Sequence, residues 1–483
     1  MTMTPDKQAR ATKQSLLSLL EPTGQQHLLA FWDELDSAQQ SSLAVQIEAL
    51  DLKLIQSLFR GEVDQPDWAE LSRRAVSPPA IRLSQRSSPA SPESGFNDEA
   101  AQQQGAVALR AGQVGVILTA GGQGSRLGFD LPKSLYPIGP LSSVSLLQIH
   151  IEKIRATAAR YGVAIPLYLM TSPATHRETV QFLAENNNFG LAAADLIVFC
   201  QGTMPAVDIE TGKLLLAEPG RLFLSPDGHG GTVAALEASG AIDHMQARGI
   251  EQLFYFQVDN PLVPICDSAL VGYHLLAESE LSSLTVAKQL PQDKLGNFAL
   301  IDGRLHVIEY SDLPDDVAEL RDDQGRLKFW AGSIAVHIFE RSLLVRTLKL
   351  KDSLPVHIAK KKVPYVDATG RQAVPSEPNA LKFEKFIFDL LPAAVRPIVV
   401  EYAEEDCFAP LKNAPGADKD TAEYVQQMML AQHRQWLEAA GAQVAAAAQV
   451  EISPLFALDA PGVAERIEPG QQFSESQYLC NKQ

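Results

Sequence analysis

The sequence predicts an α/β protein with a mostly parallel sheet, a helical module before it and a small domain after it. Three observations lead to this fold class. Short apolar runs alternate with helical periodicity through the middle of the chain, residues 14–60 are helical in pattern without strand-like runs, and a stretch rich in Pro and Ser separates the two parts. Alternating strands and helices favour a parallel sheet with helices on both faces.

The helical module is predicted over residues 14–60, where apolar clusters recur at helical spacing between Glu, Gln and Ser. Residues 77–96 are rich in Pro, Ser and Arg, a composition that neither continues a helix nor forms a central strand. They indicate a linker or a segment wrapped over the surface. We therefore place the first domain, a helical N-terminal module and linker, at residues 1–97.

The α/β core is predicted over residues 98–397. Its strand-like runs are Val114–Thr119, Leu167–Thr171, Leu196–Phe199 and Phe254–Val258. Its helical segments are Leu146–Tyr161, Thr175–Asn187 and Thr232–Ala247, the second opening with the capping-box pattern Thr175-x-x-Glu178. Sheets of this kind bind ligands beyond the carboxyl ends of their strands.

Residues 398–483 form a predicted C-terminal domain. A strand-like run, Ile398–Tyr402, is followed by a loop, a helix over Thr421–Ala440 and a weakly patterned tail. We find no internal repeat that would change this division into three parts.

The composition favours a soluble protein of the cytoplasm. A formal net charge of −17 repels polyphosphate backbones, so we expect no nucleic-acid partner and a locally basic cleft for any bound phosphate. The four cysteines are widely spaced without a CxxC pair, which indicates packing residues in a reducing compartment. No apolar run reaches the roughly 18 residues of a membrane span, so we expect no membrane partner.

A glycine-rich loop follows the first predicted strand directly. It runs from Leu118 to Gly128 with the sequence LTAGGQGSRLG. Glycines let backbone N–H groups approach phosphate oxygens that a Cβ would obstruct, and Arg126 and Lys133 add two cations. The spacing fits neither the dinucleotide fingerprint nor the Walker A loop. The residues alone therefore predict phosphate binding beside two cations.

Ordered motifs along nearly the whole chain resemble one family. The run from Gly121 to Lys133, GGQGSRLGxxxPK, resembles the signature of the sugar-nucleotide pyrophosphorylases, and its continuation resembles the eukaryotic-type UDP-N-acetylhexosamine pyrophosphorylases. Further matching motifs are His27–Trp32, Gln201–Ala206, Pro226–Gly228, Val258–Asn260, Val307–Ser311, Lys382–Asp389, Pro410–Asn413 and Glu451–Leu455. The resemblance implies a Rossmann-like uridylyltransferase core.

The implied reaction joins UTP and an N-acetylhexosamine 1-phosphate, in which the sugar is N-acetylglucosamine, to give a UDP-sugar and diphosphate. A phosphate monoester has its second pKa near 6, so the attacking phosphate is already ionised and no general base is needed. The protein must supply in-line positioning and positive charge. This expectation agrees with the absence of a Ser/His/Asp arrangement in the sequence.

The resemblance also implies residue roles in the chemistry. Arg126 and Lys133 would hold and activate the UTP phosphates, Lys412 would reach in from the C-terminal part, and Lys382 would contact the sugar phosphate. Asp259, at the end of a predicted strand, would be an oxygen ligand for Mg²⁺, which substrate phosphates would also hold. From the residues alone, a lone Asp after a strand also fits a turn cap.

Substrate recognition is implied in the same way. An amide pairs with the donor and acceptor of uracil, which gives Gln201 the role of base reader. The backbone groups that would help it are those of Ala120, Gly121, Gly122 and Gly228. The residues implied for the sugar are His229, Gly296, Glu309, Ser333, Phe386 and Phe388. Core packing is the alternative for the two phenylalanines.

Two departures from the family pattern concern the sugar. His229 lies where the hexosamine enzymes usually have Asn, and Ser333 lies where they carry Asn in AGNI. The triplet Gly-His-Gly is more reminiscent of UDP-glucose and broad-specificity UDP-sugar pyrophosphorylases, which form the alternative function. A shorter Ser333 would lose a direct hydrogen bond or leave room for water.

A non-catalytic nucleotide-sugar binding protein is a second alternative. The joint presence of Arg126, Lys133, Asp259 and Lys412 argues against it. We expect UTP, a sugar 1-phosphate and the UDP-sugar product as partners, and a monomer or weak homodimer.

Overall fold

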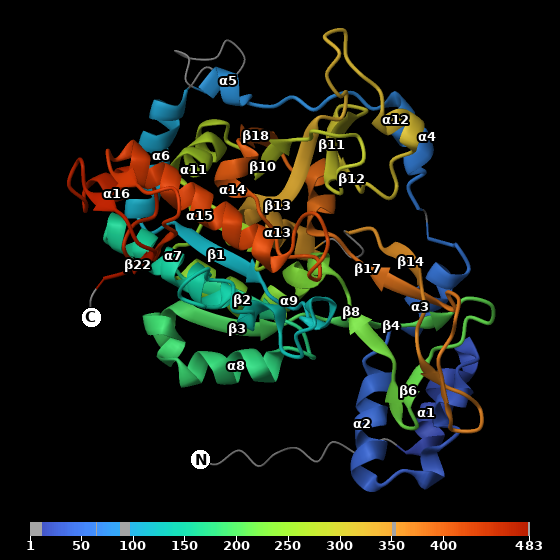
Figure 1. Cartoon of the computed structure of the whole chain (residues 1–483). Coiled ribbons are helices and arrows are strands. Elements are labelled where there is room, and N and C mark those ends of the chain that lie inside the picture. The colour runs from blue at the N-terminus through green and yellow to red at the C-terminus, as the bar shows by residue number, and fades with distance from the viewer. Residues whose placement is uncertain (1–11, 64, 87–96, 350–353, 482–483) are drawn as a thin grey trace. The chain divides into compact units, whose positions relative to one another are not determined.

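The computed structural model describes residues 12–63, 65–86, 97–349 and 354–481 (Figure 1). Backbone contacts divide the chain into two units. Unit 1 comprises Met1–Pro66, Gly202–Gly231 and Leu354–Ile387, and unit 2 comprises Asp67–Gln201, Thr232–Ser353 and Phe388–Gln483. The predicted boundaries near residues 97 and 397 both lie within unit 2, and the division into three consecutive domains stays a prediction.

A nine-stranded sheet forms the centre of unit 2. Its strands are β1 (Val114–Thr119), β2 (Leu167–Thr171), β3 (Leu196–Cys200), β9 (Gln252–Gln257), β10 (Leu281–Ala287), β11 (Gly296–Ile301), β12 (Arg304–Ile308), β13 (Ala331–Glu340) and β18 (Ile398–Tyr402). They run in the order β12-β11-β13-β9-β1-β2-β3, and β10 pairs with β13 and β18. Neighbours are parallel through β3-β2-β1-β9 and between β10 and β18, and antiparallel elsewhere.

The parallel strands β1 and β2 are buried as their sequences predict. Every residue of β1 and β2 is buried, because helices on the two faces of a parallel sheet leave neither face in water. The register places Leu118 beside both Leu169 and Phe256, so the carboxyl ends of β2, β1 and β9 lie next to one another. The predicted α/β, Rossmann-like fold class is confirmed.

Helices connect these strands. They are α6 (Asp98–Arg110), α7 (Leu146–Tyr161), α8 (His176–Glu185), α9 (Thr232–Ala238), α10 (Ala241–Ala247), α11 (Ser268–Leu276), α13 (Arg341–Lys349) and α15 (Ala422–Ala439), with shorter helices α4 (Trp68–Arg74), α5 (Leu83–Arg86), α12 (Asp315–Ala318), α14 (Glu404–Cys407) and α16 (Ala460–Ala464). The predicted span of α7 is confirmed at both ends. The hydroxyl of Ser145 accepts the Gln148 N–H at its start, and Gly162 ends it with a φ of 71°.

Two local expectations are wrong. The Thr175 side chain does not cap α8, because its hydroxyl accepts the N–H of Ser172 in the preceding turn. The single helix expected over 232–247 is two helices, broken at Gly240, whose φ of 75° a continuous helix does not allow.

The described part of the Pro- and Ser-rich stretch follows the surface of unit 2. The backbone of Ile81 pairs with Val400 of β18. The Arg82 guanidinium donates to the Glu401 carboxylate at 2.7 Å and lies over the Trp330 ring. For these residues the structure therefore favours the wrapped segment over the linker; the expectation for residues 87–96 lies outside the described residues.

Unit 1 combines N-terminal helices with strands from later in the chain. The helices are α1 (Lys13–Leu20), α2 (Ser37–Glu48) and α3 (Leu52–Phe59); the strands are β4 (Thr203–Pro205), β5 (Val207–Asp208), β6 (Leu216–Glu218), β7 (Arg221–Leu222), β8 (Leu224–Pro226), β14 (His357–Lys361), β15 (Tyr365–Val366), β16 (Gln372–Ala373) and β17 (Ala380–Glu384). The apolar faces of the helices pack against these strands, as Leu20, Ile47 and Phe383 do in one buried cluster. The helical prediction is confirmed, but its strand partners were not predicted.

The end of the chain has its own small apolar cluster. Leu437 of α15 packs with Val450, Val463 and Phe473, between the short strands β19 (Gln443–Val444), β20 (Val450–Ile452), β21 (Gln472–Phe473) and β22 (Gln477–Leu479).

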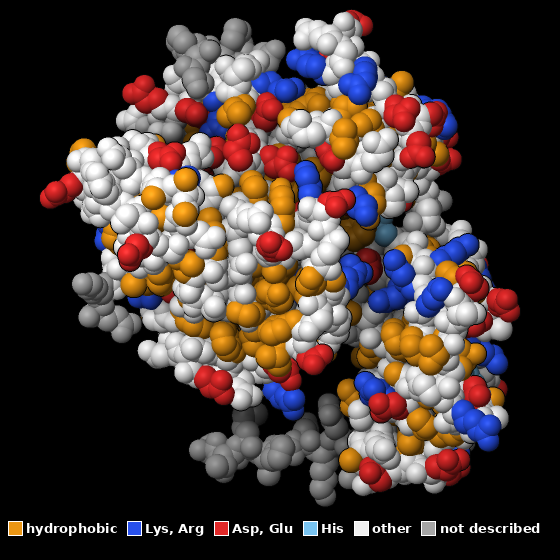
Figure 2. Space-filling view, in the orientation of Figure 1, with side chains coloured by type: hydrophobic (Ala, Val, Ile, Leu, Met, Phe, Trp, Pro, Cys, Tyr) orange, Lys and Arg blue, Asp and Glu red, His pale blue; other side chains and the backbone are white. Residues whose placement is uncertain are grey.

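Acidic side chains are spread over the face displayed in Figure 2. No helix in the described ranges combines the length and apolar character that crossing a membrane requires.

Candidate active site

The glycine-rich loop after β1 folds back on itself through backbone hydrogen bonds. The N–H of Lys133 donates to the Gly122 carbonyl at 3.0 Å, and the N–H of Gly124 donates to the Leu131 carbonyl at 3.0 Å. These bonds bring Lys133 beside the glycines. Arg126 is exposed on the turn η4 (Ser125–Leu127), which lies between Gly124 and Lys133 in the sequence. Within the described ranges it forms no ion pair.

Two adjacent glycines of the loop have different surroundings. A Cβ on Gly121 would lie 2.6 Å from Gln201 Oε1 and 3.2 Å from Ser172 Cβ, whereas a Cβ on Gly122 would meet no protein atom within 4 Å. Gly121 therefore permits the close approach of the Gln201 amide, and Gly122 borders open space. The predicted base reader and the predicted phosphate loop are in direct contact.

Hydrogen bonds at the end of β2 support this contact. The N–H of Gln201 donates to the Thr171 carbonyl at 2.9 Å, and the Ser172 hydroxyl donates to the Gly121 carbonyl at 2.7 Å. Ala120, whose N–H donates to the Met170 carbonyl at 2.7 Å, continues the β1–β2 pairing into the loop. The first residues after the three neighbouring strands β1, β2 and β3 thus hold one another in place.

Asp259 follows β9 at the same edge of the sheet. Its Oδ2 lies 3.8 Å from the Nζ of Lys133, and the two side chains are 13% and 20% exposed. This separation is too long for a hydrogen bond, although near a protein surface two charges about 4 Å apart gain about 4 kcal/mol of Coulomb energy before desolvation is subtracted. The carboxylate oxygens of Asp259 are therefore not committed to short bonds with Lys133.

Lys412 reaches this place from a distant part of the chain. The N–H of Leu411 donates to the Asp259 carbonyl at 2.8 Å, and the N–H groups of Lys412 and Asn413 both donate to the Asp420 carbonyl. Burial raises the pKa of the Asp420 carboxyl, the Lys412 ammonium opposes this rise, and the Asp259 carboxylate adds to it. The structure thus gathers Lys133, Asp259 and Lys412 around the loop.

Three of the predicted sugar residues also lie together in unit 2. Gly296 on β11 pairs with Ser333 on β13. A Cβ on Gly296 would lie 2.6 Å from Val307 Cγ1, 3.4 Å from Glu309 Oε1 and 3.5 Å from Ser333 Cβ. Glu309 follows β12, so residues of three strands lie close together, and the lack of a Cβ at Gly296 permits the close approach of Val307.

The other predicted residues divide between the units. Gly228, His229, Lys382 and Phe386 belong to unit 1, and Phe388 begins the last segment of unit 2. Lys382 is half-buried on β17, and Phe388 is buried in the short helix η9 (Ile387–Ala393) in the manner of a core residue.

His229 is held by neighbours within unit 1. Its ring stacks on Phe386 with centroids 5.2 Å apart, and the N–H of Ile387 donates to its Nδ1 at 3.1 Å. Burial and, to a smaller extent, the charge of His357 lower the pKa of His229 to about 4. His229 is therefore neutral at pH 7, with its proton on Nε2. Gly228, with a φ of 83°, allows this turn, since a Cβ there would overlap the Lys385 carbonyl.

A metal ion would find one carboxylate here. In the described ranges, no three His, Cys, Asp or Glu side chains converge on a possible metal site. Mg²⁺ usually keeps several waters and binds through one or two carboxylates and substrate phosphates. The single carboxylate of Asp259 beside the glycine-rich loop fits a divalent metal of that kind.

Sequence reasoning missed the support that α7 gives to the Asp259 loop. The His150 Nε2–H donates to the Val258 carbonyl at 2.9 Å, and the Lys153 ammonium donates to the carbonyls of Pro261 and Val263 at 2.5 and 3.0 Å. Burial lowers the pKa of His150 to about 3, so the ring is neutral. The available signal was a histidine and a lysine three residues apart on the apolar face of a predicted helix.

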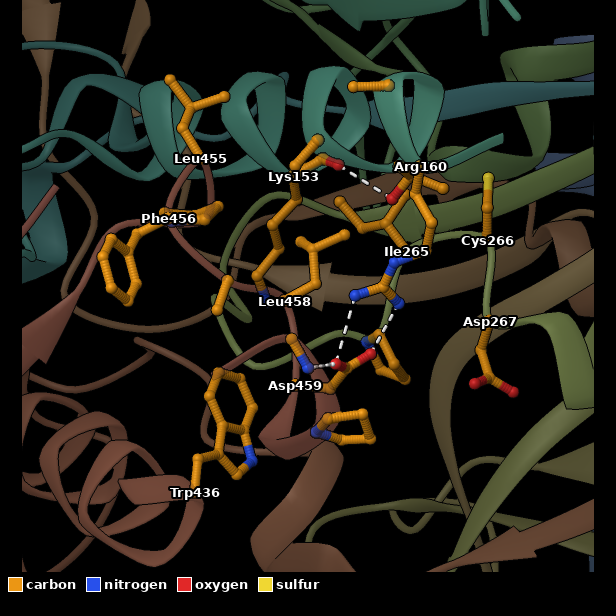
Figure 3. A pocket seen from close by; sticks show the side chains of 18 of the residues that line it. Lys153, Arg160, Ile265, Cys266, Asp267, Trp436, Leu455, Phe456, Leu458 and Asp459 are labelled. Atoms are coloured by element: carbon orange, nitrogen blue, oxygen red, sulfur yellow. Dashed lines mark hydrogen bonds and ion pairs between the residues drawn. The ribbon is translucent and has the colours of Figure 1, made fainter. Parts of the chain in front are cut away.

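Lys153 also lines a cavity of about 960 Å³, which none of the predicted site residues lines. Figure 3 shows Lys153 and Arg160 extending from α7 into it, with Arg160 paired to Asp459. The cavity is thus separate from the predicted site.

A glycine-rich loop flanked by two lysines and a carboxylate, at the carboxyl edge of a Rossmann-like sheet, meets the needs of transfer between phosphates, and it defines the class as a nucleotidyltransferase. The chain belongs to the UTP–glucose-1-phosphate uridylyltransferase family, whose model matches residues 74–461.

Known relatives agree with this assignment. The chain is 38% identical to the UDP-N-acetylglucosamine pyrophosphorylase of Saccharomyces cerevisiae over 72% of this chain and 75% of that protein. It is 34% identical to the human UDP-N-acetylhexosamine pyrophosphorylase-like protein 1 over 89% of this chain and 87% of that protein. The fold matches the crystal structure of the Trypanosoma brucei UDP-N-acetylglucosamine pyrophosphorylase with an inhibitor, at a TM-score of 0.80 and 24% identity over 97% and 99% of the two chains.

Proposed function

We propose that this protein transfers the uridylyl group of UTP to an N-acetylhexosamine 1-phosphate, with N-acetylglucosamine as the sugar, and releases diphosphate. The cluster of Lys133, Asp259 and Lys412 around a glycine loop that contacts Gln201 carries this proposal. Membership of a uridylyltransferase family and relatives named for N-acetylhexosamine substrates support it.

In the proposed reaction, an oxygen of the sugar phosphate attacks the α-phosphorus of UTP, and the bond to the bridging oxygen of diphosphate breaks. The attacking phosphate is ionised near pH 7, so the protein moves no proton. Lys133 and Arg126 neutralise charge on the UTP phosphates, and Lys412 does so where the two phosphates meet. Asp259, together with the substrate phosphates, would hold Mg²⁺, which would supply further positive charge for the leaving diphosphate.

Substrate recognition is proposed for the remaining residues. The Gln201 amide pairs with the uracil imide, and the backbone of Ala120, Gly121 and Gly122 holds the nucleotide. Gly296, Glu309 and Ser333 bind the sugar. The unit 1 residues Gly228, His229, Phe386 and Lys382, with Phe388, keep the roles that the family resemblance implies.

The identity of the sugar is tested by initial rates with UTP, Mg²⁺ and a panel of sugar 1-phosphates. We expect the N-acetylglucosamine compound to be used best. A glucose 1-phosphate rate about tenfold higher would replace the proposal by a UDP-glucose pyrophosphorylase, since tenfold corresponds to about 1.4 kcal/mol of discrimination. Ser333→Asn, which restores the residue usual in the hexosamine enzymes, should raise the preference for the acetylated sugar.

The setting of the reaction is also proposed. We infer a cytoplasmic enzyme that works as a monomer or weak homodimer. Its four cysteines, widely spaced without a CxxC pair, support a reducing compartment. Removal of divalent metal by a chelator should stop turnover, and Mg²⁺ should restore it better than Ca²⁺. The reason is that Ca²⁺ prefers more oxygen ligands than one carboxylate and a diphosphate can supply.

A further inference from the structure

Asn260, the residue after Asp259, makes three hydrogen bonds with its buried side chain. Its Nδ2 donates to the Cys407 carbonyl at 2.8 Å, and its Oδ1 accepts the N–H groups of Ala409 at 3.1 Å and Leu262 at 3.2 Å. The side chain is 3% exposed. Because Oδ1 faces two backbone N–H donors and Nδ2 faces a backbone carbonyl, these partners fix the orientation of the Asn260 amide.

The bonds to Cys407 and Ala409 join two segments that are far apart in the sequence, whereas the bond from Leu262 is local. One segment is the pair Asp259 and Asn260 just after β9, and the other runs from Cys407 to Leu411. The N–H of Leu411 adds a third bond between them, to the Asp259 carbonyl. The next residue is Lys412, so the backbone from which Lys412 extends is tied to the backbone that carries Asp259.

The position of the Lys412 ammonium depends on this connection. Lys412 is exposed, its Nζ lies 5.6 Å from the Phe408 ring centroid, and in the described ranges it forms no ion pair. A long flexible side chain without such a partner is placed mainly by its backbone. Displacing a reacting or charge-stabilising group by about 1 Å can cost about a hundredfold in rate.

We propose that Asn260 is a positioning residue that sets the place of Lys412 relative to Asp259 during uridylyl transfer. This inference rests on the proposed function, in which Lys412 and Asp259 act on the same pair of phosphates. Asn260 touches no substrate in this proposal, and its effect passes through the segment from Cys407 to Leu411.

A control residue contacts the chain next to this segment. Gln432 on α15 is another buried amide, and its Nε2 donates to the Asp406 carbonyl at 2.8 Å. It supports the residue before Cys407 without bonding to the residues after β9. A purely structural effect of losing either amide should not depend on the Lys412 side chain, because the groups that lose a partner are backbone groups.

A double-mutant cycle tests the proposal. Asn260→Ser in the otherwise unchanged enzyme should lower kcat about tenfold, with the KM for UTP changed less than about twofold. In the Lys412→Ala background the same substitution should lower kcat by less than about twofold, because there is no ammonium left to misplace. Gln432→Ala should change kcat by one and the same small factor in both backgrounds.

The outcomes distinguish the inference from the proposed function. If Asn260→Ser lowers kcat by equal factors in both backgrounds, or not at all, Asn260 does not act through Lys412 and the inference is wrong. If Lys412→Ala alone leaves kcat unchanged, the role of Lys412 in the proposed function is wrong. Thermal unfolding identifies a variant that fails to fold, and Asn260→Thr, which fills more of the vacated space, then replaces Asn260→Ser in the cycle.

Discussion

Replacing Lys133 by alanine removes a charge from the glycine-rich loop and keeps the backbone hydrogen bonds that hold the loop together. The bond that closes the loop uses the backbone N–H of Lys133, which alanine keeps. What is lost is the ammonium 3.8 Å from Asp259 Oδ2. The substitution therefore separates the charge of Lys133 from its structural place in the loop.

The expected loss follows from the position of that ammonium. Removing one preorganised group that stabilises developing charge costs about 2.7–4 kcal/mol, or about a hundredfold to a thousandfold in kcat. Because the Lys133 side chain is 20% exposed, water screens part of its charge, and we expect the lower end, about a hundredfold. Asp259 also loses its positive neighbour, which adds unfavourable charge beside the phosphates.

The assay is the initial rate of diphosphate release at saturating UTP and sugar phosphate. Lys53→Ala, at an exposed position on α3, makes the same change in net charge and should leave the rate unchanged. Thermal unfolding should show that both variants are folded. Turnover of Lys133→Ala within about threefold of the unsubstituted enzyme would remove Lys133 from the mechanism, since about 0.7 kcal/mol is too little for a charge that acts on the reacting phosphates.

Three further predictions concern the loop, the metal and stability. Gly122→Val should abolish UTP binding in calorimetry, because the side chain would enter the open space beside the loop, and wild-type affinity would contradict phosphate binding by this loop. Gly121→Ala should raise the KM for UTP about tenfold, because the added methyl group would displace the Gln201 amide. Asp259→Asn should raise the Mg²⁺ concentration needed for half-maximal turnover, because an amide binds a divalent cation more weakly than a carboxylate; an unchanged requirement would show that the nucleotide alone holds the metal. Burial lowers the pKa of His274 to about 3, so between that value and about 6.5 the unfolded chain binds an extra proton and stability falls as pH falls. Denaturant titrations from pH 6 to 4 measure the free energy of unfolding. Between these pH values it should fall by about 1.4 kcal/mol per pH unit less in His274→Asn than in the unsubstituted protein. An equal dependence of the free energy of unfolding on pH in both proteins would show that His274 is not neutral when folded.

The sequence predicts the elements best where burial is complete. The spans of β1, β2, β18 and α7 agree with the structure at both ends, because strands covered on both faces give continuous apolar runs and α7 has clear signals at each end. Prediction is poorer where a local polar group has two possible partners. Thr175 fits a helix cap by its pattern, but a neighbouring turn uses its hydroxyl instead.

The candidate site divides in the same way. The glycine loop is contiguous, and its composition predicts a backbone able to approach phosphate. The grouping of Gly296, Glu309 and Ser333 could not be read from spacing, since it depends on how β11, β12 and β13 are paired in space. Only the family resemblance placed those three residues together before the structure was known.

By itself, the sequence determined the α/β fold class, the glycine-rich loop from Gly121 to Lys133 and, through its resemblance to relatives, the chemistry of uridylyl transfer. Only the tertiary structure decided how the backbone beside Lys412 is tied to that of Asp259, with Asn260 joining their two segments. The physical reason lies in the partners of that amide, which are backbone groups. Nearly every residue carries the same N–H and C=O, so no sequence pattern marks which of them a distant side chain will bind.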